Sequence, residues 1–311
     1  MKILIVGLGS IGKKHLNAIY KLQPNSHIFR LVSAQSVQKK AFGYLKIQNI
    51  NQEDLQKFKF DYAIIANPSS LHYNVLLKLI PLNIPIFLEK PPVLTVDQLE
   101  SIIDIVKSGK NYIYIACNLR FHPIIKKIKE KLEVDKPKIN EVNIYCGSYL
   151  PVWRKGVDYS TTYSAQAKMG GGVHLDMYHE FDYIYYLFGN PIQAKSFRKK
   201  KSNLLIDSID SAVYIMEFNH FHLTLGLNYF RIHPKREIEI IFENEIWNCD
   251  IINNCIKITN ELESNEICFN TVDTYFEQMN DFIKNINTNT LVNNNPIQNS
   301  LEILKTCLTN D

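Results

Sequence analysis

A glycine-rich turn near the beginning of the chain constrains the fold more than any other feature. Residues 3–6 are apolar and predict a short buried strand, and the helical pattern of residues 11–22 begins almost at once. Gly7, Gly9 and Gly12 connect the two in the spacing G-x-G-x-x-G. This is the context of the dinucleotide fingerprint, whose glycines permit the tight turn, the approach of a pyrophosphate and the packing of helix on strand.

The helix after this turn offers backbone N–H groups and the positive end of its dipole to phosphates. We therefore expect a nucleotide cofactor at the turn. The residues expected to contact it there are Gly7, Gly9, Ser10, Ile11 and Gly12. The alternative is a glycine-rich turn whose role is structural alone.

The first third of the chain alternates apolar strands with helices. Further strands are predicted at residues 28–32, 62–66, 84–88 and 112–116. This alternation indicates an α/β fold with a doubly wound parallel sheet, of the Rossmann type. Ligands of such sheets bind beyond the carboxyl ends of the strands. The residues predicted at those ends are Gly7, Ser33, Asn67, Glu89 and Asn118.

The regular alternation of strands and helices ends after residue 118. We predict a dinucleotide-binding domain at residues 1–118 and a substrate-binding and oligomerisation α/β domain at residues 119–311. In the second domain a helix is expected over residues 173–187, followed by strands whose apolar residues alternate with period two. This alternation predicts an open, largely antiparallel sheet with one covered face. The possible contributors to its other face are Tyr214, Leu225 and Ile240.

Composition narrows the function classes. The chain has 311 residues, 46% of them hydrophobic and 21% charged, and a dispersed net charge of +4, which argues against a nucleic-acid partner. No apolar run approaches the roughly 20 residues that span a bilayer, and the early apolar run is interrupted, so we expect a cytoplasmic protein without membrane association.

Six cysteines lie outside any C-x-x-C pair and predict buried free thiols. They are Cys117, Cys146, Cys249, Cys255, Cys268 and Cys307.

Two strand ends carry motifs expected beside the cofactor. Asn67 and Pro68 open a segment that reaches His72, and Glu89 and Lys90 precede a proline pair. Because proline lacks an N–H donor and disfavours helix before it, Lys90 is held extended at the mouth of the crevice. A third motif, at the domain junction, supplies Asn118 and Arg120. The cofactor-binding residues predicted from these three motifs are Asn67, Pro68, His72, Glu89, Lys90, Asn118 and Arg120.

A glycine run introduces the predicted helix of the second domain, which carries Asp176, His179 and Asp182 at spacings of three. Residues three apart share a helical face, and a carboxylate beside an imidazole suits general acid–base chemistry. We favour His179 as the acid/base over the alternative His174. Asp, His and Glu side chains also bind metals, but no H-E-x-x-H spacing is present and we expect no metal.

These motifs together resemble the Gfo/Idh/MocA oxidoreductase family over nearly the whole chain. The resemblance rests on the glycine turn, the Asn67–His72 segment, Glu89-Lys90-Pro91 and the Asp176-x-x-His179 helix. It implies a Rossmann domain, a second α/β domain with an open sheet, and NAD(P)-dependent redox chemistry on sugars or cyclitols. It further implies that Lys90 touches nicotinamide and substrate, that His179 is the acid/base and that Asp176 orients the reacting hydroxyl.

Cofactor choice depends on the end of the second strand. The acid that normally binds the adenosine ribose is absent there, where Ser33 stands instead, and Lys39 and Lys40 follow. Without an acid a 2′-phosphate is not repelled, so NADP is expected as well as NAD. Ser33 or a backbone amide is the alternative partner for the ribose diol of NAD.

An aromatic loop before the helix completes the predicted substrate site. Trp153, Arg154 and Tyr163 resemble a family branch associated with surface-sugar synthesis. Aromatic rings stack on sugars, and arginine pairs with phosphate or carboxylate; simple packing of the loop is the alternative. The predicted substrate-binding residues are Lys90, Trp153, Arg154, Tyr163, Asp176 and His179.

The predicted function is hydride transfer between nicotinamide and a hydroxyl carbon of a sugar or nucleotide-sugar. Two alternatives remain open: an NAD-dependent glycosidase that works through transient oxidation, and a non-catalytic cofactor-sensing subunit. Apolar residues on both faces of the second sheet, together with the family resemblance, predict a homodimer or homotetramer.

Overall fold

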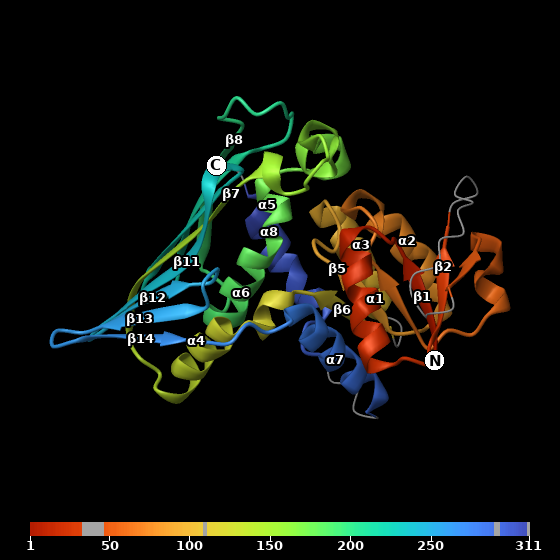
Figure 1. Cartoon of the computed structure of the whole chain (residues 1–311), viewed down its shortest axis with the longest axis horizontal. Coiled ribbons are helices and arrows are strands. Elements are labelled where there is room, and N and C mark those ends of the chain that lie inside the picture. The colour runs from red at the N-terminus through yellow and green to blue at the C-terminus, as the bar shows by residue number, and fades with distance from the viewer. Residues whose placement is uncertain (33–46, 108–110, 289–292, 310–311) are drawn as a thin grey trace. The chain divides into compact units, whose positions relative to one another are not determined.

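The protein consists of two compact units (Figure 1). The computed structural model describes residues 1–32, 47–107, 111–288 and 293–309. Unit 1 comprises Met1–Asn118 and Asp273–Leu301, and unit 2 comprises Leu119–Val272 and Glu302–Asp311. The division after residue 118 coincides with the predicted boundary. The predicted assignment of all later residues to the second domain needs correction, because Asp273–Leu301 pack with unit 1.

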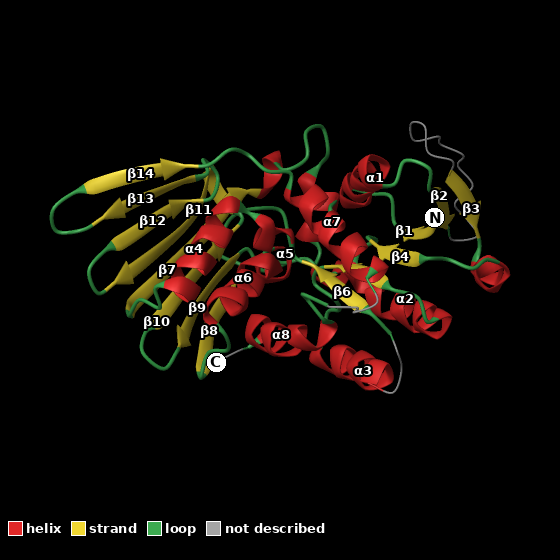
Figure 2. Ribbon diagram, turned by 90° about the horizontal axis from the view of Figure 1, so that it is seen from below, coloured by secondary structure: helices red, strands yellow, loops and turns green. Residues whose placement is uncertain are grey.

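Unit 1 contains a parallel six-stranded sheet in the order β3-β2-β1-β4-β5-β6, which confirms the predicted doubly wound fold (Figure 2). Its order reverses between β1 and β4, and this is where such sheets bind their ligands. The strands are β1 (Lys2–Val6), β2 (His27–Leu31), β3 (Ile47–Ile50), β4 (Tyr62–Ile65), β5 (Ile86–Glu89) and β6 (Ile113–Ala116). The first helices are α1 (Ser10–Leu22), α2 (His72–Leu79) and α3 (Val96–Lys107).

Helix α7 (Thr274–Asn287) belongs to unit 1 because its apolar face completes the core of that unit. The Phe282 side chain is fully buried, and its ring centroid lies 5.3 Å from that of Tyr62, 5.2 Å from that of Phe87 and 5.7 Å from that of Tyr114. These three rings come from β4, β5 and β6. A segment distant in sequence thus seals the sheet that the first 118 residues form.

Unit 2 contains an eight-stranded sheet in the order β14-β13-β12-β11-β7-β10-β9-β8. Among the described strands, β7 and β10 pair in parallel and the other neighbours are antiparallel, as predicted for a largely antiparallel sheet. The strands are β7 (Ile139–Tyr149), β8 (Gln193–Lys199), β9 (Ser211–Glu217), β10 (His222–Asn228), β11 (Phe230–Phe242), β12 (Ile246–Asp250), β13 (Cys255–Thr259) and β14 (Ser264–Cys268).

Helices cover one face of this sheet (Figure 2). They are α4 (Pro123–Val134), α5 (Val173–Asp176) and α6 (Tyr178–Phe188); α8 (Ser300–Leu308) ends the chain's regular structure. The longest of the described helices, α7, has 14 residues, whereas a bilayer span needs about 20. Within the described residues we find no helix with both the length and the apolar character that crossing a membrane requires.

The uncovered sheet face differs from the prediction. Tyr214, Leu225 and Ile240 are fully buried and lie on the helix-covered face. The exposed apolar residues are their neighbours in the alternation: Val213 and Ile215 on β9 are 41% and 46% exposed, and Phe197 on β8, which pairs with Val213, is 59% exposed. The alternation of apolar and polar residues correctly predicted which residues share a face of each strand. The packing of the helices determines which of the two faces is covered.

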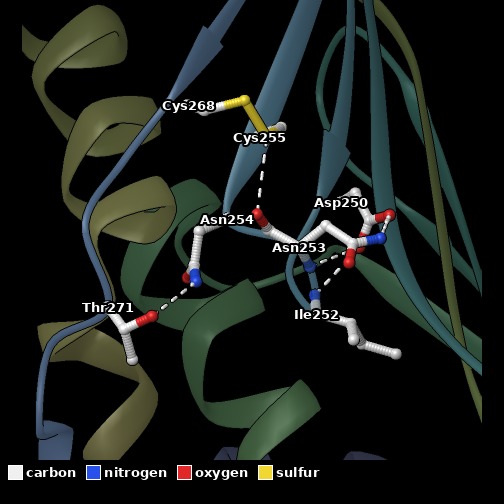
Figure 3. The surroundings of a disulfide bond; sticks show 7 residues. All are labelled: Asp250, Ile252, Asn253, Asn254, Cys255, Cys268 and Thr271. Carbon is white, nitrogen blue, oxygen red and sulfur yellow. Dashed lines mark hydrogen bonds between the residues drawn. A yellow bond between two sulfur atoms is a disulfide. The ribbon is translucent and has the colours of Figure 1, made fainter.

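One pair of cysteines corrects the expectation of six free thiols. Cys255 begins β13, Cys268 ends β14, and the two form a disulfide (Figure 3). They are register partners in the antiparallel hairpin, which brings together two residues 13 apart in sequence. The other four cysteines are buried thiols.

We predict that Phe282→Ala will destabilise the protein by about 3–5 kcal/mol, because it removes a buried ring that three strands share. Denaturant unfolding measures this change in the free energy of unfolding. Lys284→Ala is the control, since Lys284 is exposed on the same helix and its loss should change stability by less than about 0.5 kcal/mol. Equal stability of the two variants would contradict the assignment of α7 to the core of unit 1.

Candidate functional site

The predicted cofactor turn has a backbone geometry that requires its first and third glycines. Gly7 adopts a φ of +94°, and a β-carbon there would lie 2.4 Å from the backbone nitrogen of Asn67. A β-carbon on Gly12 would lie 2.2 Å from the carbonyl oxygen of Gly7. Both contacts involve backbone atoms, which cannot move aside as a flexible side chain would. Only glycine therefore fits at either position.

Gly9 has a different environment, because a β-carbon on it would meet no atom within 4 Å. Directly after it, Ser10 and Ile11 begin α1. Within the described residues this helix start has no side-chain cap and no acidic residue in its first turn. Open space beside Gly9 and N–H groups left uncapped by side chains fit the pyrophosphate of a dinucleotide.

His72 connects the segments that follow β4 and β5. It is fully buried, with Nε2 3.0 Å from the carbonyl oxygen of Asn67 and Nδ1 2.9 Å from that of Pro91. Burial lowers the pKa of His72, so the ring is neutral at pH 7 and donates to one of these carbonyls. The ring thus holds the two segments together, while Asn67 and Pro68 keep exposed surface at the end of β4.

His15 is a buried residue that the sequence analysis did not single out. Its Nε2 lies 2.5 Å from Oε1 of Glu89, and the other carboxylate oxygen of Glu89 accepts a hydrogen bond from the backbone N–H of Lys90 at 3.2 Å. Glu89 therefore acts on the position of Lys90, which is half-buried. The position of His15 on the apolar face of α1, three residues after Gly12, is the signal that points to it.

The third motif is divided between the units. In unit 1 the side-chain amide of Asn118 donates to Oγ1 of Thr274 at 2.7 Å. In unit 2 the guanidinium of Arg120 forms two 2.7 Å hydrogen bonds to the Asp182 carboxylate and stacks near the ring of Tyr186. Arg120 is thus held in an ion pair, and its contact with the cofactor stays a prediction. Ser33, with Lys39 and Lys40, lies outside the described residues.

The glycine run of unit 2 also lies close to other backbone atoms. A β-carbon on Gly171 would lie 2.3 Å from the carbonyl oxygen of Tyr163 and 2.6 Å from that of Ser164, and Gly172 has a φ of +131°. The predicted continuous helix is in fact two, α5 and α6, separated at Met177, whose φ and ψ are −92° and 24°. The spacing rule for one helix therefore does not apply between Asp176 and His179.

Asp176 lies in a cluster that brings together most of the predicted substrate residues. The hydroxyl of Tyr229 donates to its Oδ2 at 2.5 Å. Burial and the Asp176 charge raise the pKa of both Tyr229 and Tyr163. Trp153 packs edge-on against Tyr229 at 5.3 Å, and the Arg154 guanidinium lies 5.2 Å from the Tyr163 ring. Tyr229, which the sequence analysis missed, is fully buried between β10 and β11.

His179 is close to a carboxylate other than the predicted ones. Its Nε2 lies 3.2 Å from Oε1 of Glu180, which is completely buried. The same oxygen pairs with Nη2 of Arg236, and the other accepts from the Tyr183 hydroxyl at 2.6 Å. Burial alone would raise the pKa of Glu180, but Arg236 and His179 hold that pKa well below its usual range. Glu180 is therefore ionised at pH 7.

The alternative acid/base, His174, is poorly suited to proton transfer near neutral pH. It is 5% exposed, and burial, assisted by the charge of Arg198, lowers its pKa to about 3. A general base works best when its pKa lies near the working pH. The burial of His174 and its low pKa therefore favour His179 as the proposed acid/base.

Comparisons with known proteins identify a family model and relatives that resemble this chain. Residues 1–116 match a family model described as an oxidoreductase family with an NAD-binding Rossmann fold. Myo-inositol 2-dehydrogenase of Thermotoga maritima is 22% identical to this chain over 310 residues, which cover 92% of this chain and 88% of that protein.

Two solved structures share the fold along its whole length. One is UDP-N-acetylglucosamine 3-dehydrogenase of Acidithiobacillus ferrooxidans, with a TM-score of 0.76 at 17% identity over 99% of this chain and 95% of that one. The other is an oxidoreductase from Agrobacterium radiobacter in complex with NAD+, L-tartaric acid and magnesium, with a TM-score of 0.80 at 14% identity over 100% and 95%. At such identities the likeness establishes the fold alone.

We predict that Gly9→Ala and Gly12→Ala will separate cofactor binding from folding. Gly9→Ala should weaken dinucleotide binding about tenfold or more, because the methyl group occupies the open approach to the turn, while stability changes by less than about 1 kcal/mol. Gly12→Ala should cost about 1–3 kcal/mol or more of stability through overpacking. Calorimetric cofactor titration and denaturant unfolding measure the two effects. Unchanged binding by the folded Gly9 variant would contradict the assigned approach.

Proposed function

This chain belongs to the Gfo/Idh/MocA oxidoreductase family, and from that premise we propose that it transfers a hydride between nicotinamide and a hydroxyl carbon of a sugar or nucleotide-sugar. The observation that carries the proposal is the cluster of Trp153, Arg154 and Tyr163 around Asp176, just before the helix of His179. A carboxylate, aromatic rings and a guanidinium are the groups that bind sugar hydroxyls, sugar faces and phosphates.

Each of the three proposed catalytic residues has a distinct role. During oxidation His179 accepts the hydroxyl proton, the Lys90 ammonium stabilises the developing alkoxide, and Asp176 orients a neighbouring hydroxyl. A bound nicotinamide supplies the acceptor for the hydride. The carbonyl forms as the proton and the hydride leave, and the reverse reaction uses His179 as the acid.

We propose a nucleotide-sugar of surface-polysaccharide synthesis as the substrate. The aromatic loop with Arg154 supports this class, since an exposed guanidinium beside aromatic side chains suits a diphosphate next to a sugar. The fold shared with a UDP-N-acetylglucosamine 3-dehydrogenase is consistent with it. Mass spectrometry of molecules that copurify with the protein, followed by assays of UDP-sugars for NAD(P)H formation, tests the substrate class.

We propose that the protein assembles through the uncovered face of the unit 2 sheet. Phe197, Val213 and Ile215 form an exposed apolar patch there. Val213 also borders a hollow of about 350 Å³, whose other lining residues include Tyr145 and the polar Lys235, Glu237 and Asn248. Water solvates such apolar residues poorly, so a second copy that covers the face would stabilise it.

Lys90→Ala is expected to lower turnover by roughly 100-fold or more while cofactor affinity changes little, because the lost charge acts on the reacting oxygen. Steady-state kinetics and cofactor titration separate the two quantities. Lys107→Ala, which removes an exposed lysine of unit 1, should retain full activity. If Lys90→Ala turned over at a near-normal rate, Lys90 would be excluded from the mechanism.

NADP should bind at least as tightly as NAD, because no acid follows the second strand to repel a 2′-phosphate. Equilibrium titration with each cofactor under the same conditions measures both dissociation constants. A strong preference for NAD would refute this expectation and favour the ribose contact through Ser33 or a backbone amide.

Light scattering should show a mass of two or four times the 36.1 kDa chain. Asp in place of both Phe197 and Val213 should dissociate the assembly, because it places charges on the apolar patch. Val134→Asp is the control, since Val134 is an exposed apolar residue on α4, on the covered side of the sheet. A wild-type mass of a single chain would rule out the assembly.

A further inference from the structure

The connection between β8 and β9, residues 200–210, is a segment to which the proposed function gives no role. We call it the β8–β9 loop. Its shape depends on Asp210, which is fully buried. The Asp210 carboxylate accepts hydrogen bonds from the backbone N–H groups of Lys201 and Ser202 at 2.6 and 2.9 Å, and from the Ser202 hydroxyl at 2.5 Å. One buried side chain therefore holds the two ends of the loop together.

The β8–β9 loop is hydrogen-bonded to the part of the aromatic loop that directly follows the predicted substrate tyrosine. The Ser208 hydroxyl donates to the carbonyl oxygen of Ser164 at 2.7 Å, and both residues are 1% exposed. One carboxylate oxygen of Asp207 accepts from the backbone N–H of Ala167 at 2.7 Å. The backbone N–H groups of Asp207 and Ser208 also donate to the carbonyl oxygen of Ala165, at 3.1 and 3.3 Å. Two adjacent residues thus hold this short segment by both side chain and backbone.

The same loop reaches the two elements that meet at Asp176. The carbonyl oxygen of Ile209 accepts from the backbone N–H of Val173, the first residue of α5, at 2.8 Å. The carbonyl oxygen of Asp210 accepts from the backbone N–H of Tyr229 at 3.0 Å. Helix α5 ends at Asp176, to which the Tyr229 hydroxyl donates. Consecutive residues of one loop are therefore hydrogen-bonded to the segments that carry the predicted substrate tyrosine, the carboxylate and its buried partner.

The proposed substrate site depends on how its aromatic ring and its carboxylate are placed. Burial and the charge of Asp176 raise the pKa of Tyr163, so the two side chains are close. They belong to segments on either side of the glycine run at Gly171, and the β8–β9 loop is hydrogen-bonded to both segments. Functional side chains keep their geometry only when the residues behind them are held in place.

We propose that Asp207 and Ser208 are positioning residues, which hold Tyr163 beside Asp176 and thereby determine the affinity for the sugar part of the substrate. This inference rests on the proposed function for its effect on substrate binding, whereas the hold on residues 164–167 does not. Both residues act through the Tyr163 ring, so their effect on binding depends on that ring. The predicted cofactor turn belongs to unit 1, so cofactor affinity does not depend on them.

The direct test is hydrogen exchange of the wild-type protein, measured for single residues by NMR. The backbone amides of Ala167 and Val173 donate to the β8–β9 loop. Each should therefore exchange at least about 100-fold more slowly than in a free peptide. Exchange of the Ala167 amide at the free-peptide rate would overturn the proposal, without any variant having to fold.

Variants then test whether Asp207 holds the segment. Asp207→Ala should speed exchange of the Ala167 amide about tenfold or more, because its acceptor is lost. Asp207→Asn should restore most of the protection, since its side-chain carbonyl oxygen accepts the same hydrogen bond. The matched control is Asp250→Ala, because Asp250 likewise accepts from backbone N–H groups in a turn of unit 2, those of Ile252 and Asn253 (Figure 3). If Asp207→Ala behaved like this control, Asp207 would not hold the segment.

Kinetics test the effect on substrate binding. Asp207→Ala and Ser208→Ala should each raise KM for the sugar about fivefold or more, while kcat and cofactor affinity change less than about twofold. In a Tyr163→Ala background, Asp207→Ala should have almost no further effect on KM, because residues that act through one another are not additive. Fully additive effects would refute the route through Tyr163.

The two kinds of measurement separate this inference from the proposed function. If the wild type oxidises no sugar but Asp207→Ala speeds exchange of the Ala167 amide, the proposed function fails and the hold on the aromatic loop stands. If sugars are oxidised and both variants keep the wild-type KM, only the positioning role fails.

Discussion

Both units are built around a point where two stretches of backbone approach too closely to leave room for a β-carbon. In unit 1, Gly12 meets the carbonyl oxygen of Gly7, and in unit 2, Gly171 meets the carbonyl oxygens of Tyr163 and Ser164. The first contact packs the first turn of α1 against the backbone that follows β1, and the second lies just before α5. The predicted cofactor turn lies at the first contact, and Asp176 and His179 follow the second within one or two turns of helix, so the placement of these residues depends on backbone packing.

Buried carboxylates impose the second constraint. Asp176, Glu180 and Asp182 lie within seven residues of one another and are almost wholly buried. A buried charge is tolerated only with a partner, and removal of the partner costs about 3–5 kcal/mol. The three carboxylates have different partners: Tyr229 for Asp176, Arg236 for Glu180 and Arg120 for Asp182. The strands and loops packed on this region must therefore supply these groups, which ties the sheet of unit 2 to the site.

Local sequence patterns predicted the structural features that depend on residues close in sequence. They failed for the features that depend on contacts between segments distant in sequence. The glycine spacing predicted the turn at Gly7, and apolar runs predicted most strands. The inclusion of α7 in unit 1 was missed, because its apolar face gives no sign of which sheet it will cover. The covered face of the second sheet was misassigned for the same reason, although the alternation that includes Tyr214 was correct.

The candidate site shows the same difference between features that local sequence predicts and features that it does not. Lys90, Asp176 and His179 could be selected by motif, since strand ends and glycine-led helices mark functional positions. The partners of Glu89 and Asp176, which are His15 and Tyr229, could not, because a lone buried histidine or tyrosine looks like any core residue until its hydrogen bond is seen. The predicted pairing of Asp176 with His179 assumed a continuous helix and took no account of the break at Met177.

That break has an evolutionary consequence. Because α5 and α6 are separate helices, Asp176 belongs to the aromatic loop and Tyr229, while His179 belongs to the network of Glu180 and Arg236. Changes in the loop that alter the proposed substrate site therefore need not disturb the group proposed to move the proton. A scaffold divided in this way would let substrate range change while the proposed acid–base group keeps its surroundings.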